Sequence, residues 1–481
     1  MKTILLQSIR KNVDKQFILN HGIRYLYKDL FNFLVNLNNS LFTNNHQRVL
    51  ISMPQGFYAY GSILASYLTN ATFCFIAKDL PLERKAHIIN QFKPDVILTQ
   101  NDASISNFNT IPIIDFGDTN YLVNLSNPSE TIFSCFDSEI IYVYFTSGST
   151  GFPKGCCIKR ISVEKIVLWA IKEFELTGND IWGQYTPLHF DMSLIDVFGA
   201  TCLGASLVSF STVADKLRPG NLIREHKISF LNIVPQVIDI LIKAKQLNNE
   251  YCQSLSTIRF GGDKVYTCTV EKLFDILPKL IIISTYGPTE TTFFCTFMKM
   301  NQQNYKNYST DILTIGEPIP GCKIELENVD NEIGEIVISG EYIGLGYLGS
   351  EQFGYNSIEI DGITHRFYRT GDYAKIIQNF LYFYGRKDSQ IKINGQRFSL
   401  LEIEVAAKKC GCEDCAAIYF NNMIVCFYID SNKSLGNNRL NELLKTYIQE
   451  MFLPQKYISM DQMPYNANGK IDRLKLRKIL E

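Results

Sequence analysis

A loop rich in glycine and hydroxyl residues follows an apolar strand in the first third of the chain. The strand EIIYVYF at 139–145 runs directly into the segment TSGSTGFPKG at 146–155. Glycines permit close backbone approach, and amide N–H groups, hydroxyls and a lysine all favour anionic oxygens. A P-loop requires its lysine to be followed by Ser or Thr, whereas Lys154 stands between Pro153 and Gly155. The residues therefore favour a different kind of phosphate-binding loop over a plain surface loop.

Four more short motifs follow in order: YGPTETT at 286–292, YRTGD at 368–372, GRKD at 385–388 and NGKIDR at 468–473. Each alone has an ordinary structural explanation, since Tyr-Gly-Pro is a turn signal and Arg-Thr-Gly-Asp suits a hairpin tip. Together with the loop, the ordered set resembles the adenylate-forming superfamily. Within it, the chain is most similar to the amino-acid adenylation domains of nonribosomal peptide synthetases and to the D-alanine:carrier-protein ligases. The resemblance covers nearly the whole chain.

The resemblance implies a site for ATP and Mg²⁺. Glu290 would supply a carboxylate to Mg²⁺, a cation that prefers oxygen ligands. Thr289 would contact the α-phosphate, and Asp372 would accept both ribose hydroxyls, because a carboxylate has two acceptor oxygens. Ser284 departs from the family pattern, which often has Asn or Asp there for the adenine amine. The implied ATP- and AMP-binding residues are Thr146, Ser147, Gly148, Ser149, Thr150, Gly151, Lys154, Tyr286, Gly287, Asp372 and Arg386.

Lys470 belongs to an Asn-Gly-Lys turn near the C-terminus, where a lysine is usually solvated. The resemblance implies instead that Lys470 is a catalytic residue, as are Glu290 and Thr289. A mobile C-terminal domain would carry Lys470 to the substrate carboxylate and the α-phosphate. Asp388 would be the hinge, and rotation after adenylate formation would let a thiol reach the adenylate.

Asp191 lies in the segment HFDMS, which matches a family motif whose aspartate pairs with the α-ammonium group of an amino acid. A ligase for acids without an amine has no reason to keep this carboxylate, because desolvating it without a cation costs several kcal/mol. The structural alternative is an N-cap of the next helix, a task that Ser193 would serve equally well. The other implied substrate-binding residues are Met192, Ile195, Asn232, Arg259, Gly261, Thr285, Phe293 and Phe294.

Arg259 is an unusual member of this set, since it interrupts an apolar strand. Strand alternation places Arg259 and Gly261 on the same face. A buried guanidinium needs an acceptor. A polar or acidic substrate side chain and a protein carboxylate such as Asp263 both remain open as that acceptor.

Strands and helices alternate from about residue 48, which predicts βαβ units and parallel pairing. The runs 57–68 and 82–92 are among the expected helices, and short strands with turns begin near 323. We therefore predict an α/β fold with a large N-terminal domain of doubly wound sheets at 1–387. It would include a β-rich subdomain from about 315. A small α+β domain would follow at 388–481, and the resemblance implies that this domain is mobile.

Composition excludes other classes. The 481 residues carry 47 basic and 48 acidic side chains, with no basic block, so binding of nucleic acid is not expected. No apolar run is long enough for a membrane span. The thirteen cysteines are scattered, as in a reducing cytoplasm. Cys410, Cys412 and Cys415 form one cluster, but structural zinc normally takes four ligands.

The predicted function is activation of an amino acid as aminoacyl-AMP with release of pyrophosphate. Transfer to the phosphopantetheine thiol of a carrier protein would follow, and this acceptor is expected in trans because no carrier signature is present. D-alanine ligation is one form of this reaction. The alternatives are an aryl or aliphatic acid–CoA ligase and a non-catalytic homologue that acts as a binding protein.

Overall fold

The structure is a computed structural model of the 481-residue chain. It describes residues 1–20, 22–80, 82–102, 104–105, 111–116, 137–146, 154–330, 332–349, 355–360, 363–386, 390–393, 396–421, 423–431, 435–448, 450–466 and 470–481.

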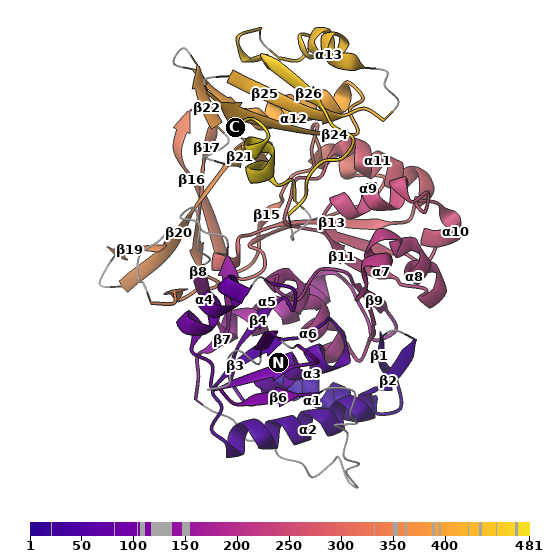
Figure 1. Ribbon diagram of the computed structural model, residues 1–481, viewed down its shortest axis with the longest axis vertical. Coiled ribbons are helices and arrows are strands. Elements are labelled where there is room, and N and C mark those ends of the chain that lie inside the picture. The colour runs from indigo at the N-terminus through magenta and orange to yellow at the C-terminus, as the bar shows by residue number, and fades with distance from the viewer. Residues whose placement is uncertain are drawn as a thin grey trace.

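One seven-stranded sheet forms the lower part of the molecule in Figure 1, in the order β18-β8-β7-β4-β3-β5-β6. Strands β7, β4, β3, β5 and β6 are parallel, and β8 and β18 add antiparallel pairs at one edge. The strands are β3 (Arg48–Ser52), β4 (Thr72–Ile76), β5 (Val96–Thr99), β6 (Ile113–Asp115), β7 (Ile140–Thr146), β8 (Lys154–Lys159) and β18 (Gly346–Tyr347).

A second, nine-stranded sheet has the order β15-β14-β13-β12-β11-β9-β10-β1-β2. Its central strands from β13 to β1 are parallel, and antiparallel strands close both edges. The strands are β1 (Gln16–Asn20), β2 (Ile23–Leu26), β9 (Ile181–Gln184), β10 (Ser206–Ser209), β11 (Phe230–Ile233), β12 (Thr257–Phe260), β13 (Ile281–Tyr286), β14 (Thr296–Met300) and β15 (Glu317–Pro318).

Antiparallel strands follow from residue 322. A five-stranded sheet contains β16 (Cys322–Asp330), β17 (Ile333–Gly340), β19 (Tyr355–Ile360), β20 (Ile363–Ile377) and β21 (Phe380–Arg386). The C-terminal part has the pair β22 (Gln390–Ile393) and β23 (Gln396–Ser399), and the sheet β24 (Asp414–Phe420), β25 (Met423–Ile429) and β26 (Lys456–Ser459). This part buries its own apolar clusters, one of them built around Ile403, Cys426 and Leu440.

Helices accompany the two large sheets and the C-terminal strands. They are α1 (Lys2–Lys11), α2 (Tyr27–Thr43), α3 (Phe57–Leu68), α4 (Leu82–Phe92), α5 (Arg160–Glu173), α6 (Leu194–Leu203), α7 (Val213–Leu217), α8 (Pro219–His226), α9 (Gln236–Lys243), α10 (Asn249–Cys252), α11 (Thr267–Ile276), α12 (Leu400–Lys409), α13 (Gly436–Leu444) and α14 (Arg473–Lys478). Those between α1 and α11 accompany the two large sheets, and α12, α13 and α14 pack against the C-terminal strands. Short 3₁₀ turns include η3 (Asp191–Ser193) and η4 (Thr289–Thr291).

The predicted α/β fold is confirmed, and the change of pattern near residue 323 corresponds to the five-stranded antiparallel sheet. Helices α3 and α4 have the predicted bounds. The apolar pattern of residues 236–247 predicts a helix over that whole range, but α9 ends at Lys243, and Lys245 has a left-handed φ of 56°. Helices α1 and α2 had not been predicted from the sequence.

Candidate active site

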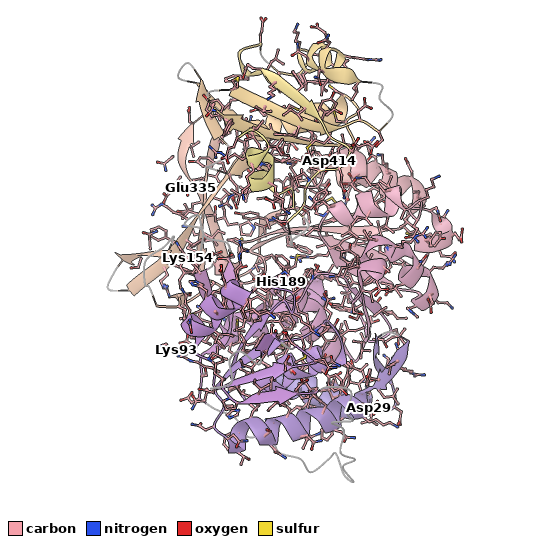
Figure 2. The ribbon with its side chains drawn as sticks, in the orientation of Figure 1. Asp29, Lys93, Lys154, His189, Glu335 and Asp414 are labelled. Carbon is pink, nitrogen blue, oxygen red and sulfur yellow. The ribbon has the colours of Figure 1, made fainter. Side chains whose placement is uncertain are left out.

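Several predicted site residues lie at the carboxyl ends of parallel strands, where open α/β sheets usually bind ligands. Thr146 ends β7, Tyr286 ends β13, and η4 follows β13 directly. Figure 2 shows Lys154, the first residue of β8, and His189, two residues before Asp191, at mid-height of the molecule and below the C-terminal strands.

Lys154 and Glu290 are joined through Tyr347. Thr146 and Lys154 are paired residues of β7 and β8, so the predicted phosphate loop starts and ends at one place. The Lys154 Nζ lies 5.8 Å from the centroid of the Tyr347 ring. The Tyr347 hydroxyl donates to Glu290 Oε1 at 2.5 Å. Ser147, Gly148, Ser149, Thr150 and Gly151 lie outside the described residues.

Glu290 has the environment expected of a cation ligand. It is 7% exposed, and no cationic side chain within the described ranges forms an ion pair with it. Its backbone carbonyl is fixed by the Tyr355 hydroxyl at 3.2 Å and the Gly344 N–H at 2.9 Å. A nearly buried carboxylate without a cationic partner is costly. Mg²⁺, which would be held through oxygen ligands, fits this position.

The predicted ribose site is assembled from three segments. Asp372 accepts from the Tyr286 hydroxyl at 2.7 Å and from Arg386 at 2.8 Å, and Asp372 and Arg386 are paired residues of β20 and β21. Gly287 packs so closely that an added Cβ would lie 2.4 Å from the Phe294 Cα. Ser284 donates its hydroxyl to the Thr314 carbonyl at 2.7 Å.

Asp191 is buried without an ion-pair partner among the described residues. Its Oδ2 lies 3.4 Å from the Phe293 N–H and 3.5 Å from the Tyr142 hydroxyl. Thr292 and Phe293 both have a left-handed φ, and the turn they form presents this N–H to the carboxylate. Strained backbone of this kind is often found at functional sites. The N-cap alternative is not supported, because Asp191 makes no side-chain cap of η3 or α6, and neither does Ser193.

Burial raises the pKa of Asp191 to about 6, and nearby Glu290 adds to the rise, while the Phe293 and Met192 N–H groups and the Thr289 hydroxyl oppose it. These contributions also place Thr289 and Glu290 beside Asp191. The carboxylate is therefore mainly ionised at neutral pH and is available to a cation.

We predict an acid limb in the pH profile of the enzyme. Below pH 6, kcat/KM for an amine-bearing substrate should fall about tenfold per pH unit, because protonation of Asp191 removes the partner of the ammonium group. Kinetics between pH 5 and 8 would test this. A variant with Asp191→Asn should show no such limb, and an identical limb in that variant would contradict the assignment.

Several of the remaining predicted substrate residues lie around Arg259, which is 1% exposed. Arg259 donates to Asn232 Oδ1 at 2.7 Å, and its Cζ lies 4.8 Å from the centroid of the Phe294 ring. A Cβ on Gly261 would lie 3.0 Å from the Met192 Sδ and 3.2 Å from the Arg259 Cζ. Burial lowers the pKa of Arg259 to about 10, so the group remains charged at neutral pH.

Asp196, and not Asp263, is the carboxylate nearest to this arginine in the hydrogen-bond network. Asn232 donates to Asp196 Oδ1 at 3.0 Å and so links it to Arg259, whereas Asp263 accepts from Gln236 at 2.7 Å. The Arg259 Nε and the Asp196 Oδ2 are both buried without a partner within the described residues. Ile195, Thr285 and Phe293, the other predicted substrate residues, are buried as well.

Replacement of Arg259 by alanine should change substrate preference. The truncation leaves space beside Gly261 and Met192, so larger apolar amino acids should gain in kcat/KM and the preferred substrate should lose roughly 10- to 100-fold. Pyrophosphate exchange with a panel of amino acids would measure both effects. An equal loss for every substrate would show that Arg259 has a structural role.

Lys470 is exposed, and its carbonyl accepts a hydrogen bond from the Asn466 N–H at 2.8 Å. The predicted hinge, Asp388, lies outside the described residues. Sequence reasoning missed Tyr347 and Asp196. The Gly-Tyr pair at 346–347 could have drawn attention to Tyr347, whereas no sequence pattern around Asp196 marks it as a functional residue.

The described residues contain neither a membrane-spanning helix nor a metal-binding cluster. In the part of the chain that the structure describes, no helix has both the length and the apolar character needed to cross a membrane. Within the same residues, no group of three or more His, Cys, Asp or Glu side chains is arranged to hold a metal ion.

Comparisons with known proteins agree on one family. A family model described as AMP-binding enzyme matches residues 5–348. A relative from Staphylococcus epidermidis, D-alanine--D-alanyl carrier protein ligase, is 28% identical over 426 residues, which are 84% of each chain. A second, from Staphylococcus aureus and with the same name, is 29% identical over 428 residues and 83% of each chain.

Two solved structures share the fold over almost the whole length. The crystal structure of IdnL7 has a TM-score of 0.85 at 21% identity and covers 99% of this chain and 98% of its own. The Vibrio cholerae adenylation domain AlmE, in complex with glycyl-adenosine-5'-phosphate, has a TM-score of 0.71 at 21% identity and covers 100% and 98%. Since the family model spans more than half of its length, the chain belongs to the AMP-binding enzymes.

Proposed function

We propose that this enzyme uses ATP to convert an amino acid to aminoacyl-AMP and then transfers the aminoacyl group to the phosphopantetheine thiol of a separate carrier protein. The observation that supports the amino-acid substrate is Asp191, a buried carboxylate for which the described residues supply no ion pair. The α-ammonium group of the substrate would be its partner. Acids without an amine would leave the charge unmatched.

Adenylation brings together a carboxylate and a triphosphate, so the site must offset negative charge. Lys154 and the residues of the phosphate loop would hold the β- and γ-phosphates. Glu290 would hold Mg²⁺, which supplies charge neutralisation at the phosphates when it is bound. Asp372 would accept the ribose hydroxyls in place of one of its present donors, Tyr286 or Arg386.

The carrier thiol is the acceptor that the relatives favour, since they are named as carrier-protein ligases and align over most of both chains. AlmE, which was solved with a glycyl adenylate, shares the fold. After adenylation, we propose that the unit at 388–481 rotates about Asp388. Lys470 then leaves the adenylate, and a thiol reaches it.

ATP–pyrophosphate exchange with free amino acids, their N-acetyl derivatives, and aryl and aliphatic acids tests the first step. We expect exchange with at least one free α-amino acid and none with its N-acetyl form. Holo-carrier protein and coenzyme A, each offered with the activated substrate, test the second step. Exchange with a benzoic or fatty acid that does not depend on Asp191 would contradict the proposal.

A further inference from the structure

A buried carboxylate lies where three distant segments of the chain meet. Glu404 belongs to α12, and its side chain is 1% exposed. It accepts from the Lys264 Nζ at 2.6 Å and from the Ala417 N–H at 3.0 Å, and it also pairs with the Arg473 guanidinium. Lys264 lies in the loop after β12, Ala417 in β24 and Arg473 at the start of α14. The Glu404 side chain, which extends from α12, therefore binds all three of these segments.

Two of these segments carry residues of the candidate active site. Lys264 comes shortly after Arg259 and Gly261, at the end of the strand that contributes to the substrate pocket. Arg473 is the first residue of α14, closely following Lys470. Figure 1 shows α12 and β24 higher than α9 and α11, with β24 the nearer of the two to α11. Glu404 therefore connects the pocket strand with the segment that bears Lys470.

The two cations are both needed to balance this carboxylate. Burial alone would raise the pKa of Glu404, but Arg473 and Lys264 outweigh it and lower the pKa to about 2. The carboxylate is thus ionised at any pH at which the enzyme works. Removing one cation from a buried ion pair is strongly unfavourable, because it leaves charge that is poorly compensated.

Other contacts between the same two parts are more exposed. Lys409 of α12 pairs with Asp311 at 2.5 Å, with side chains 38% and 46% exposed. Ion pairs that are open to solvent contribute little. Lys264 and Lys408 lie 5.6 and 5.4 Å from the centroid of the Tyr266 ring, so cations from both parts contact one aromatic ring. The Lys264–Glu404 pair is the most buried charged contact of this set.

We propose that Glu404 is a positioning residue that, through Lys264, fixes the C-terminal unit in the present orientation and so sets Lys470 against the substrate pocket. This inference rests on the proposed function. In this orientation Arg473, three residues after Lys470, pairs with the same carboxylate as Lys264, which follows the pocket strand, so the Lys264–Glu404 contact favours adenylation. Rotation of the unit for thiol transfer requires this contact to break.

The test compares Lys264→Met, which keeps the length of the side chain and removes its charge, with Lys409→Met, which breaks the exposed pair. In Lys264→Met, pyrophosphate exchange should fall roughly tenfold, because the population of the adenylating orientation decreases. Transfer from synthetic aminoacyl-AMP to holo-carrier should stay within about twofold of wild type. Lys409→Met should leave both half-reactions near wild type. Equal loss of both half-reactions in Lys264→Met, or loss of neither, would overturn the proposal.

A measurement without substrate separates this inference from the proposed function. Small-angle X-ray scattering and hydrogen exchange of residues 400–409 should show a more open molecule and faster exchange in Lys264→Met than in wild type. Glu404→Gln, which also weakens the bond to Arg473, should show a larger change in the same direction. No difference in either variant would overturn the inference. A wild-type enzyme that activates no amino acid would refute only the proposed function.

Discussion

Replacing Asp191 with asparagine is expected to lower kcat/KM for the amino-acid substrate by about 100-fold or more. The amide has the same size but cannot form the ion pair with the α-ammonium group, and loss of one partner of a buried charge pair typically costs ~2–5 kcal/mol. The KM for ATP should change little, since the residues assigned to the nucleotide are untouched. Pyrophosphate exchange at saturating ATP would measure the effect.

The folded protein should tolerate this substitution. Burial raises the pKa of Asp191 from 3.8 to about 6, so the ionised form destabilises the fold by about 3 kcal/mol at pH 7. This cost appears as the pH rises through 3.8 and is complete above 6. Asp191→Asn removes it, and thermal unfolding at pH 7 should show stability equal to or above wild type. A variant that unfolds at lower temperature, with activity lost for all acids alike, would mean that Asp191 is structural.

Much of the fold followed from local patterns, because a βαβ unit combines short-range elements whose periodicity is visible in the sequence. Helices α3 and α4 show this, since their apolar spacing defines both ends. Helix α9 shows the limit, because its apolar spacing continues past Lys243 while the backbone turns at Lys245. Short-range patterns do not contain the tertiary contacts that end a helix early.

The proximity of site residues was predictable where those residues belong to recognisable sequence motifs. Tyr286, Asp372 and Arg386 meet as expected, although each comes from a different segment. The network around Arg259 was not predictable, because it depends on the register between β11 and β12, which places Asn232 opposite Arg259. Asp196 joins that network from α6, and nothing near it in sequence marks it as the carboxylate that replaces Asp263 in this role.

Substitution of Lys470 by alanine is expected to lower the rate of adenylation strongly and to leave thioester formation almost unchanged. Its ammonium group would offset the charge that develops as the carboxylate approaches the α-phosphate. Losing one positioned charge donor should lower the adenylation rate by ~10²-fold or more, with smaller changes in ATP affinity. Because Lys470 is exposed, its removal should alter stability by at most about 0.5 kcal/mol.

The second half-reaction separates this role from a general loss of activity. With synthetic aminoacyl-AMP and holo-carrier supplied, Lys470→Ala should form the thioester at nearly the wild-type rate. If both half-reactions fall together in a folded variant, rotation of the C-terminal unit is not how this enzyme alternates between them.

Combining Lys470→Ala with Lys264→Met then asks whether the two lysines act in one step. If Lys264 matters because it positions the segment that bears Lys470, its loss should cost roughly tenfold in the wild type and little in a chain that already lacks Lys470. Independent losses that multiply would mean that Lys264 supports adenylation by another route, for example through the pocket loop in which it lies.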